Sequence, residues 1–215
     1  MEISNSQKVE NMSTVIIDYG MGNISSVRNM LRYLGYSAML SCDEKEILSA
    51  DHIILPGVGN FGMAMENIKK RNLKSFLDEA VLNRGIPILG ICLGMQLMMS
   101  TSEEGNCNGM GWIKGSVDKF TLDTTIYKIP HMGWDYINPT QNSNLLDELP
   151  PEPRFYFVHS YHAKCENCKE SIAVTDYGGV FTSIIGRDNI LGVQFHPEKS
   201  HKFGMKIFDN FMRKY

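Results

Sequence analysis

The sequence lacks long hydrophobic runs and has little net charge. No stretch of about 18 uninterrupted apolar residues occurs, and the N-terminal segment has no apolar core of the kind found in signal peptides. We therefore expect a cytoplasmic protein that does not bind a membrane. The formal net charge of -3 excludes the concentrated positive surface that broad nucleic-acid binding requires. Small molecules and proteins are the expected partners.

Cysteine is also scarce, with 5 residues scattered over 215 positions. An odd, dispersed set is unlike a secreted disulfide framework and favours a reducing compartment. Cys165 and Cys168 have the spacing of a zinc or redox pair, but no second cysteine or histidine pair accompanies them at a recognisable offset. The sequence thus predicts no metal site and indicates no cofactor.

Length and hydropathy fit one globular domain, because 215 residues with a hydrophobic fraction of 43% can bury a substantial core. Residues 1–12 show no apolar periodicity and are predicted to be a flexible N-terminal tail. Residues 13–215 are expected to form the domain.

Strands and helices alternate through the first half of this domain. Predicted strands cover 14–18, 37–40, 52–55 and 87–91, and predicted helices cover 24–34, 43–48, 63–70, 73–83 and 93–99. Parallel neighbours need a crossover connection, so this alternation predicts a parallel sheet with helices on both faces.

From about Trp112 short strands dominate instead. They are predicted at 117–122, 155–158, 171–175, 180–185 and 190–195, with a hairpin turn at 187–189 and an amphipathic C-terminal helix that carries Phe203, Ile207 and Phe211. The predicted fold class is therefore α/β, with a mixed, mostly parallel sheet flanked by helices and extended by antiparallel strands.

A potential nucleophile lies where the fourth predicted strand passes into a helix. In Gly90-Ile-Cys92-Leu-Gly94, a glycine stands two positions to either side of Cys92. This pattern is typical of a nucleophile elbow, in which a strained turn presents the central side chain and small neighbours avoid clashes. The helix N-terminus favours a thiolate, and the amide of Leu93 can face an oxyanion. Taken alone, Cys92 fits a small buried core residue equally well.

The segment Gln194-Phe-His196-Pro-Glu198 supplies a base for Cys92. In an extended chain, side chains two apart lie on one face, so His196 and Glu198 project together. We expect His196 to take the thiol proton and deliver it to a leaving group, and Glu198 to fix its tautomer. By itself the tripeptide fits a polar turn, but together with an elbow cysteine it predicts a catalytic triad.

A glycine-rich turn, Pro56-Gly-Val58-Gly59, follows the third predicted strand, at the edge where open parallel sheets place their sites. Glycine permits a backbone in which an amide turns toward a substrate oxygen. We assign Gly59 and Val58, with Leu93, to an oxyanion hole. As a lone feature this turn would be an ordinary loop.

Together these residues resemble a class I (triad) glutamine amidotransferase domain, from about Thr14 to Phe211. Such domains have a flavodoxin-like fold. Among them the chain is most similar to the glutaminase subunit of imidazole glycerol phosphate synthase. The shared blocks are Asp18-Tyr-Gly-Met-Gly-Asn23, Pro56-Gly-Val-Gly59, Gly90-Ile-Cys-Leu-Gly-Met-Gln96, Pro130-His-Met-Gly-Trp134, Tyr156-Phe-Val-His-Ser160 and Phe195-His-Pro-Glu-Lys-Ser200.

The resemblance implies further site residues. Glutamine would be held by the side chains of Gln96 and Glu104 and by the backbone around Ser160 and Tyr161. Contact with a synthase partner is implied for Asn23, His131, Trp134 and Lys199.

The resemblance also implies the reaction. L-Glutamine is hydrolysed to glutamate and ammonia through a Cys92 thioester, and the ammonia passes directly to a partner, because protonated ammonia is not nucleophilic. The family's partner is a (βα)8-barrel cyclase, which forms a heterodimer with the glutaminase. The cyclase makes imidazole glycerol phosphate and an aminoimidazole carboxamide ribotide in histidine biosynthesis. Hydrolysis is low until the partner is loaded.

Some residues depart from this pattern. Asp135 replaces an asparagine, and His162 replaces the residue expected after Tyr161. The stretches 121–127 and 201–204 resemble paralogous glutaminase subunits that supply ammonia for bacterial surface-sugar amidation. That pathway is one alternative. A cysteine hydrolase acting on peptides or esters and a non-catalytic module with the same fold are the others.

Overall fold

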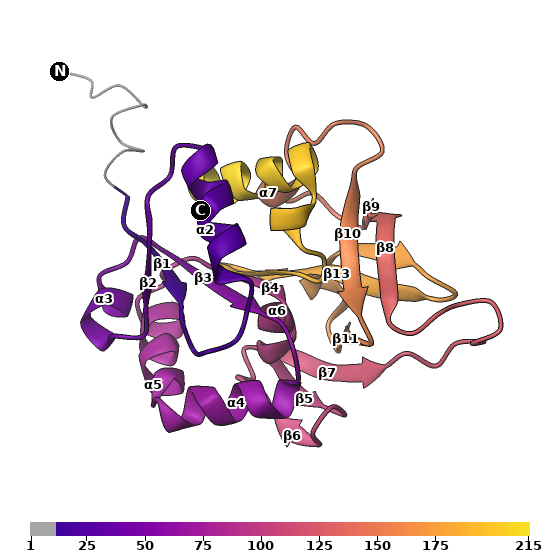
Figure 1. Ribbon diagram of the computed structural model, residues 1–215, viewed down its shortest axis with the longest axis horizontal. Helices are drawn as coiled ribbons and strands as arrows, with labels where there is room; N and C mark the ends of the chain where they lie inside the picture. Colours follow the sequence, from indigo (N-terminus) through magenta and orange to yellow (C-terminus); the bar gives the residue numbers. More distant parts are fainter. Residues whose placement is uncertain (1–11) are drawn as a thin grey trace.

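A mixed sheet runs through the middle of the computed structural model, which describes residues 12–215 (Figure 1). The first 11 residues of the predicted tail lie outside this range. In the described part, the strands follow the order β2 (Ala38–Ser41), β1 (Thr14–Ile17), β3 (His52–Gly57), β4 (Ile88–Cys92), β14 (Ile190–Val193), β13 (Val180–Arg187), β11 (Tyr161–Cys165), β7 (Ile113–Lys119), β5 (Met99–Ser102) and β6 (Cys107–Asn108). Two further strands, β12 (Ser171–Asp176) and β9 (Asn138–Pro139), extend the sheet beside β13.

Strand direction changes at the hairpin between β13 and β14. From β2 to β14 every neighbouring pair is parallel, whereas β14, β13, β11 and β7 pair antiparallel. The hairpin turn has Asp188 at φ 52°, next to the paired residues Arg187 and Ile190. The predicted fold class, a mostly parallel sheet with added antiparallel strands, is confirmed, and so is this turn.

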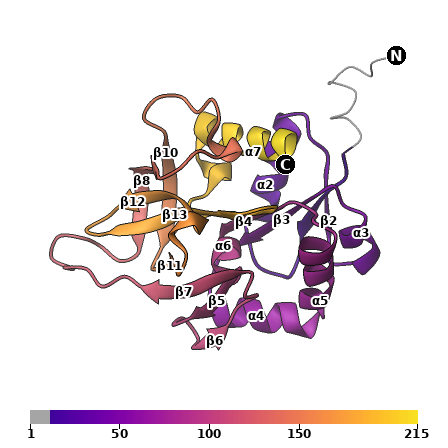
Figure 2. The ribbon, with the colours of Figure 1, turned by 180° about the vertical axis from the view of Figure 1, so that it is seen from behind.

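Helices cover both faces of the parallel part (Figures 1 and 2). On one face α2 (Ile24–Tyr33) and α7 (His201–Lys214) pack over residues such as Ile16 and Leu89. The other face carries α3 (Glu44–Leu48), α4 (Phe61–Lys70), α5 (Leu73–Asp78) and α6 (Leu93–Leu97). Apolar burial on both faces is the main stabilising contribution to such a sheet. No helix within residues 12–215 has the length and apolar character needed to cross a membrane.

A separate two-stranded ribbon stands beside the main sheet. Its strands are β8 (His131–Tyr136) and β10 (Arg154–His159), which pair antiparallel from His131 with His159 to Tyr136 with Arg154. Side chains alternate across a strand. On β10 the inward side chains Phe155, Phe157 and His159 are buried. The ribbon therefore has one face in the core and one face toward the surface.

Two predicted helices end earlier than expected. The helix predicted at 93–99 stops at Leu97, because the Leu97 and Met99 carbonyls accept the amides of Met110 and Gly111 (2.7 and 3.1 Å) and Met99 enters β5. The helix predicted at 73–83 becomes a π-helical turn over Glu79–Asn83, where the Arg84 amide donates to the Glu79 carbonyl. In both cases contacts outside the helix determine where it ends.

Several short strands were not predicted as strands. They are β5, β6, β8, β9 and β11, all in the half of the chain where pairing is mostly antiparallel. Four of them are short and mostly polar, and in β8 the apolar residues of the alternating pattern face outward, so pairing with distant strands decides their structure. The remaining short helical turns are Asn144–Leu146, Cys168–Glu170 and Pro197–Lys199.

Candidate active site

Cys92 lies at the junction of β4 and α6 with a positive φ, at φ 54° and ψ -108°. A non-glycine residue in this region is strained and persists only when its surroundings hold it there. A side-chain carbon on Gly94 would overlap the Leu55 carbonyl, and one on Gly90 would lie 2.7 Å from the Met95 amide nitrogen. The flanking glycines thus allow the close packing that fixes the elbow.

His196 and Glu198 form a buried pair in which His196 Nδ1 lies 2.8 Å from Glu198 Oε1, with both side chains 1% exposed. A carboxylate accepts, so Nδ1 carries a proton, and Nε2 is the ring atom left to exchange a proton with Cys92. Within residues 12–215, Nε2 makes no hydrogen bond of standard geometry. The pair forms differently from our expectation: β14 ends at Val193, and Glu198 lies in the turn Pro197–Lys199, not in an extended strand.

The charge state of His196 is set by opposing influences. Burial lowers its pKa, but interactions with Cys92 and Glu198 outweigh burial and raise the pKa to about 10. The protonated imidazole of His196 is therefore favoured in its place between Cys92 and Glu198. This arrangement suits a group that receives a thiol proton and holds it for a leaving group.

Gln194 connects the cysteine to the predicted substrate residues, and its role was missed in the sequence. Its Nε2 lies 3.7 Å from Cys92 Sγ, and its Oε1 accepts from Gln96 Nε2 at 3.0 Å. Gln96 Nε2 also donates to the Tyr161 carbonyl at 2.9 Å. A buried, mutually bonded amide pair holds its members in one orientation. The only signal in the sequence was the position of Gln194 two residues before His196.

A cavity of about 310 Å³ opens over Cys92. Its walls bring together the sequence-predicted residues from five separate segments of the chain. Glu104 reaches it while its Oε2 accepts the Phe61 amide at the start of α4 (2.8 Å). The lining residues are Val58, Gly59, Cys92, Leu93, Gln96, Glu104, Pro130, Val158, His159, Ser160, Tyr161 and His196. Pro130, Val158 and His159 had no assigned role in the sequence.

A histidine pair lies behind this cavity. His159 Nδ1 donates to the Tyr161 carbonyl (2.8 Å), which leaves Nε2 to accept from His131 Nδ1 (3.3 Å). Burial, reinforced by the neighbouring histidines and opposed by the hydrogen bond to Tyr161, lowers the pKa of His159 to about 3. Burial also lowers the pKa of His131. Both rings are therefore neutral at neutral pH.

These histidines predict an acid-sensitive fold. Between pH 3 and 6.5 the unfolded chain binds a proton at His159 that the folded chain does not, so the free energy of unfolding decreases as pH falls through this window. The slope from one such group is about 1.4 kcal/mol per pH unit. Urea denaturation at pH 7, 6 and 5 measures it. The His159 ring lies among Phe120, Phe157 and Phe181, so a phenylalanine fits there. His159→Phe should therefore reduce the dependence of the free energy of unfolding on pH. A dependence equal to that of the wild type would contradict the prediction.

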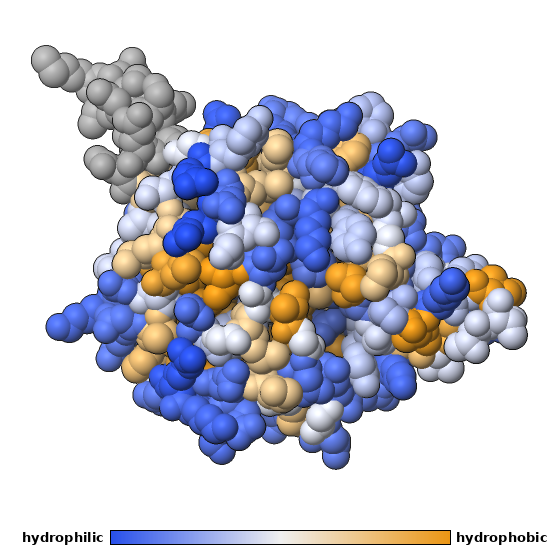
Figure 3. Space-filling view, viewed as in Figure 1, coloured by the Kyte–Doolittle hydropathy of each residue, from blue (hydrophilic) through white to orange (hydrophobic). Residues whose placement is uncertain are grey.

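Two of the four residues implied for partner contact, Trp134 and Lys199, lie by the outer face of the ribbon. Trp134 is 43% exposed, stacks on His201 at 5.5 Å and meets the Tyr156 ring edge-on at 6.2 Å. Lys199 Nζ lies 5.5 Å above that same Tyr156 ring. Figure 3 shows apolar surface over the region where β8 lies in Figure 1. The outward residues of β8 are Met132, Trp134 and Tyr136.

The other two implied contact residues are placed differently. His131 is 2% exposed and stacks on Tyr177 at 3.9 Å, so it lies beneath this surface and not on it. Asn23 precedes α2, which packs against the turn Pro197–Lys199. The structure therefore brings Trp134 and Lys199 close together, with Asn23 at the start of the adjoining helix.

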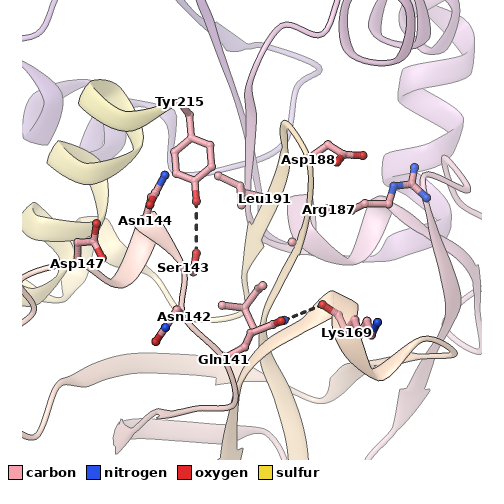
Figure 4. A pocket seen from close by; sticks show the side chains of 12 residues that line it. Gln141, Asn142, Ser143, Asn144, Asp147, Lys169, Arg187, Asp188, Leu191 and Tyr215 are labelled. Atoms are coloured by element: carbon pink, nitrogen blue, oxygen red, sulfur yellow. Dashed lines mark hydrogen bonds between the residues drawn. The ribbon is translucent and has the colours of Figure 1, made fainter.

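A second hollow, of about 420 Å³, lies by the β13–β14 turn, beside Arg187 and Asp188 (Figure 4). Tyr215 and Ser143 hydroxyls meet at 3.3 Å across it, and Gln141 donates to the Lys169 carbonyl. It contains no cysteine or histidine. Within residues 12–215, no three His, Cys, Asp or Glu side chains converge as metal ligands would, and Cys165 and Cys168 are both free thiols.

Comparison with known proteins adds to this geometry. The family model for class I glutamine amidotransferases matches residues 15–215. The chain is 48% identical over 198 residues to the imidazole glycerol phosphate synthase subunit HisH 2 of Methanococcus maripaludis, covering 92% of this chain and 98% of that protein. It is 43% identical over 198 residues to HisH 2 of Pseudomonas aeruginosa, covering 92% and 98%. A crystal structure of a glutamine amidotransferase matches 94% of this chain and 99% of its own, with a TM-score of 0.70 at 13% identity, which shows the fold alone.

Proposed function

The chain belongs to the class I glutamine amidotransferase family, and from this membership we propose that it hydrolyses L-glutamine to glutamate and ammonia through a thioester on Cys92. The observation that carries the proposal is the buried His196–Glu198 pair, 2.8 Å apart, beside a cysteine held in a strained elbow. The triad is the constellation that acyl transfer requires: a nucleophile, a base and a group that orients the base.

The reaction proceeds in two acyl-transfer steps. His196 Nε2 accepts the thiol proton, and Cys92 Sγ attacks the γ-carboxamide carbon of glutamine. The imidazolium then protonates the nitrogen as the C–N bond breaks, which releases ammonia and leaves the thioester. Water attacks the thioester with His196 as base and releases glutamate. Glu198 accepts from His196 Nδ1 throughout and stabilises the positive charge.

The substrate's ends are recognised by the cavity walls. Glu104 offers a carboxylate to the α-ammonium group of glutamine, and the Gln96 amide and the backbone at Ser160 and Tyr161 supply hydrogen bonds. Leu93, the first residue of α6, directs its amide to the oxyanion that forms during attack.

The second oxyanion donor requires a backbone turn. The Ile53 amide donates to Pro87, next to β4, and the His52 amide donates to Ser13, next to β1. In a parallel ladder, odd-numbered residues of β3 therefore face β4 and even-numbered residues face β1. Continued to the end of β3, this alternation directs the Gly57 carbonyl toward β4 and the Val58 amide away from Cys92. The Gly57–Val58 peptide must turn before Val58 or Gly59 can complete the hole, which explains why a partner would activate hydrolysis.

The proposed acceptor is a (βα)8-barrel cyclase that forms a heterodimer with this chain and uses the ammonia to make imidazole glycerol phosphate in histidine biosynthesis. Identity of 48% over nearly all of a relative named as a subunit of that synthase supports it. Ammonia has to pass between the subunits without mixing with solvent, because water would protonate it.

The test is glutamate release from L-glutamine by the purified chain, alone and with the cyclase of the same organism plus its nucleotide ligand. Hydrolysis that the cyclase increases strongly is the expected result. No hydrolysis in either condition would refute the glutaminase proposal. Hydrolysis that the cyclase leaves unchanged would refute only the partner.

A second candidate acceptor is a synthase for bacterial surface-sugar amidation. The observation that favours it is a pair of departures from the histidine-pathway pattern, both beneath the outer face of the ribbon. Asp135, where the histidine-pathway subunits usually have asparagine, approaches His131 Nε2 at 3.4 Å, and His162 packs against Phe120 at 4.8 Å. The same experiment with the cyclase distinguishes the two acceptors, because only a histidine-pathway subunit should respond.

The interface proposal predicts that Trp134→Ala weakens binding to the cyclase. An exposed tryptophan at the centre of an interface typically contributes about 2 kcal/mol or more, so we expect Kd to rise roughly thirtyfold or more, with a smaller effect on hydrolysis by the free chain. Isothermal titration measures Kd. Met39→Ala is the matched control, since Met39 is 42% exposed on the edge strand β2 at the far end of the sheet. If Trp134→Ala and Met39→Ala bound the cyclase with equal affinity, the proposal that Trp134 lies in the interface would be wrong.

A further inference from the structure

The hydroxyl of Tyr19 is buried without a partner. Tyr19 is 0% exposed, and its Oη makes no hydrogen bond to any residue in the range 12–215. Buried hydroxyls normally have a partner, and an unpaired one destabilises the fold. The Tyr19 hydroxyl takes no part in the hydrolysis steps proposed above.

Its position is at the base of the oxyanion hole. Tyr19 follows β1 by two residues and packs in the core on the α6 side of the sheet. A side-chain carbon on Gly57 would lie 2.6 Å from Tyr19 Oη, 2.8 Å from the Gly94 amide nitrogen and 2.8 Å from Leu93 Cβ. The hydroxyl therefore contacts Gly57, whose carbonyl belongs to the peptide that has to turn.

The hydroxyl also experiences the nucleophile's charge. Burial raises the pKa of Tyr19 well above its ordinary value, and the nearby Cys92 thiolate raises it further. Tyr19 thus keeps its proton throughout the reaction and can act only as a neutral hydrogen-bond donor or acceptor.

The direction of the turn completes the geometry. The Gly57 carbonyl faces β4 in the resting ladder, and β1 lies on the opposite side of β3. When the Gly57–Val58 peptide rotates to aim its amide at the substrate, its carbonyl moves to the β1 side. Tyr19 follows β1, the strand on that side of β3, and brings an unused donor to Gly57 from the α6 face of the sheet.

We propose that Tyr19 is a positioning residue that donates a hydrogen bond to the Gly57 carbonyl in the turned state, and so holds the oxyanion hole in its productive form. The inference rests on the glutaminase function proposed above. It accounts for the unpaired hydroxyl, because the group lacks its partner only while the peptide is in the resting orientation. The unpaired hydroxyl destabilises the resting state. When the Gly57–Val58 peptide turns, the hydroxyl gains a hydrogen bond, and this gain favours the state with a complete oxyanion hole.

Tyr19→Phe tests this inference, since it removes the hydroxyl and keeps the ring. In the presence of the cyclase and its nucleotide ligand, kcat for glutamine hydrolysis should fall about tenfold, the equivalent of one hydrogen bond at about 1.4 kcal/mol. KM for glutamine should stay unchanged, because the hydroxyl does not touch the substrate. Thermal stability should not fall, because the folded resting state loses no hydrogen bond.

Tyr36→Phe is the matched control. Tyr36 is also buried, but its Oη already donates to Asp209 at 2.8 Å. Its loss should lower the melting temperature by about 2–4 °C and leave kcat and KM unchanged. An unaltered kcat in Tyr19→Phe beside an active, stimulated wild type would overturn the inference, as would a rise in KM that accounts for the whole effect. A wild type that releases no glutamate would instead refute the proposed function.

Discussion

Cys92→Ser should abolish glutamine hydrolysis while the protein remains folded. Serine keeps the shape of the side chain in the strained elbow, but its hydroxyl is much harder to ionise and a far poorer nucleophile than a thiol. We expect the rate of glutamate release to fall by at least about a thousandfold, with or without a partner. The thermal midpoint and the affinity for the cyclase should remain near those of the wild type, because Cys92 lies in the cavity and not on the ribbon's outer face.

Cys168→Ser provides the control for this substitution. Cys168 is an exposed free thiol on a short helical turn, and its replacement should change neither rate nor stability. Substantial hydrolysis by Cys92→Ser would mean that another group attacks the substrate. Equal loss in both variants would indicate a general sensitivity to cysteine replacement. The same pair, assayed with peptide and ester substrates, also addresses the alternative of a different cysteine hydrolase.

Gly94→Ala should disrupt both the fold and the activity. The added methyl group would overlap the Leu55 carbonyl, which is part of a central strand and has no room to move. The start of α6 must shift instead, so we expect a loss of roughly 3 kcal/mol in the free energy of unfolding. The same shift displaces the Leu93 amide. A displacement of about 1 Å is enough to lower the rate of glutamine hydrolysis about a hundredfold.

Urea denaturation and glutamate release measure these two losses. Gly179→Ala is the control, because an added carbon there meets no atom within 4 Å. The position lies in the turn between β12 and β13 and should tolerate the change. If Gly94→Ala were as stable and as active as Gly179→Ala, the tight packing of the elbow would not be what positions Cys92.

The parallel half of the fold could be predicted because its signals are local. Buried strands such as Ile88–Cys92 are continuous apolar runs, and α2 has apolar residues at helical spacing. A local residue also fixes the start of a helix. The side chain of Asp43 accepts hydrogen bonds from the amides of Lys45 and Glu46 and so caps α3. These features depend on residues a few positions apart, so a reader of the sequence can find them.

The antiparallel half was harder, because its strands are stabilised by partners far along the chain. β8 pairs with β10 across residues 137–153. Its alternation is inverted, because the apolar Met132, Trp134 and Tyr136 face outward while polar side chains such as His131 face inward. For the same reason the sequence did not reveal Gln194 as the link between Cys92 and Gln96. Its role appears only when β4, α6 and the chain after β14 are brought together.

The candidate triad was predicted from two short motifs, and the predicted extended path between His196 and Glu198 was wrong. His196 and Glu198 meet through the turn Pro197–Lys199 and not along a strand. The backbone of this turn is tied down: the His196 amide donates to the Tyr156 carbonyl, and Ser200 Oγ donates to the His196 carbonyl. Spacing alone predicted the pairing, while long-range hydrogen bonds determine the geometry.

The two-sided ribbon of β8 and β10 has an evolutionary consequence. Its inner residue His159 lines the cavity over Cys92, while Met132, Trp134 and Tyr136 on the outer side of β8 do not line it. The ribbon shares no strand pairing with the main sheet in the part of the chain that the structure describes. If the outer face binds the synthase as proposed, substitutions there can change the partner without altering any side chain that lines the cavity over Cys92.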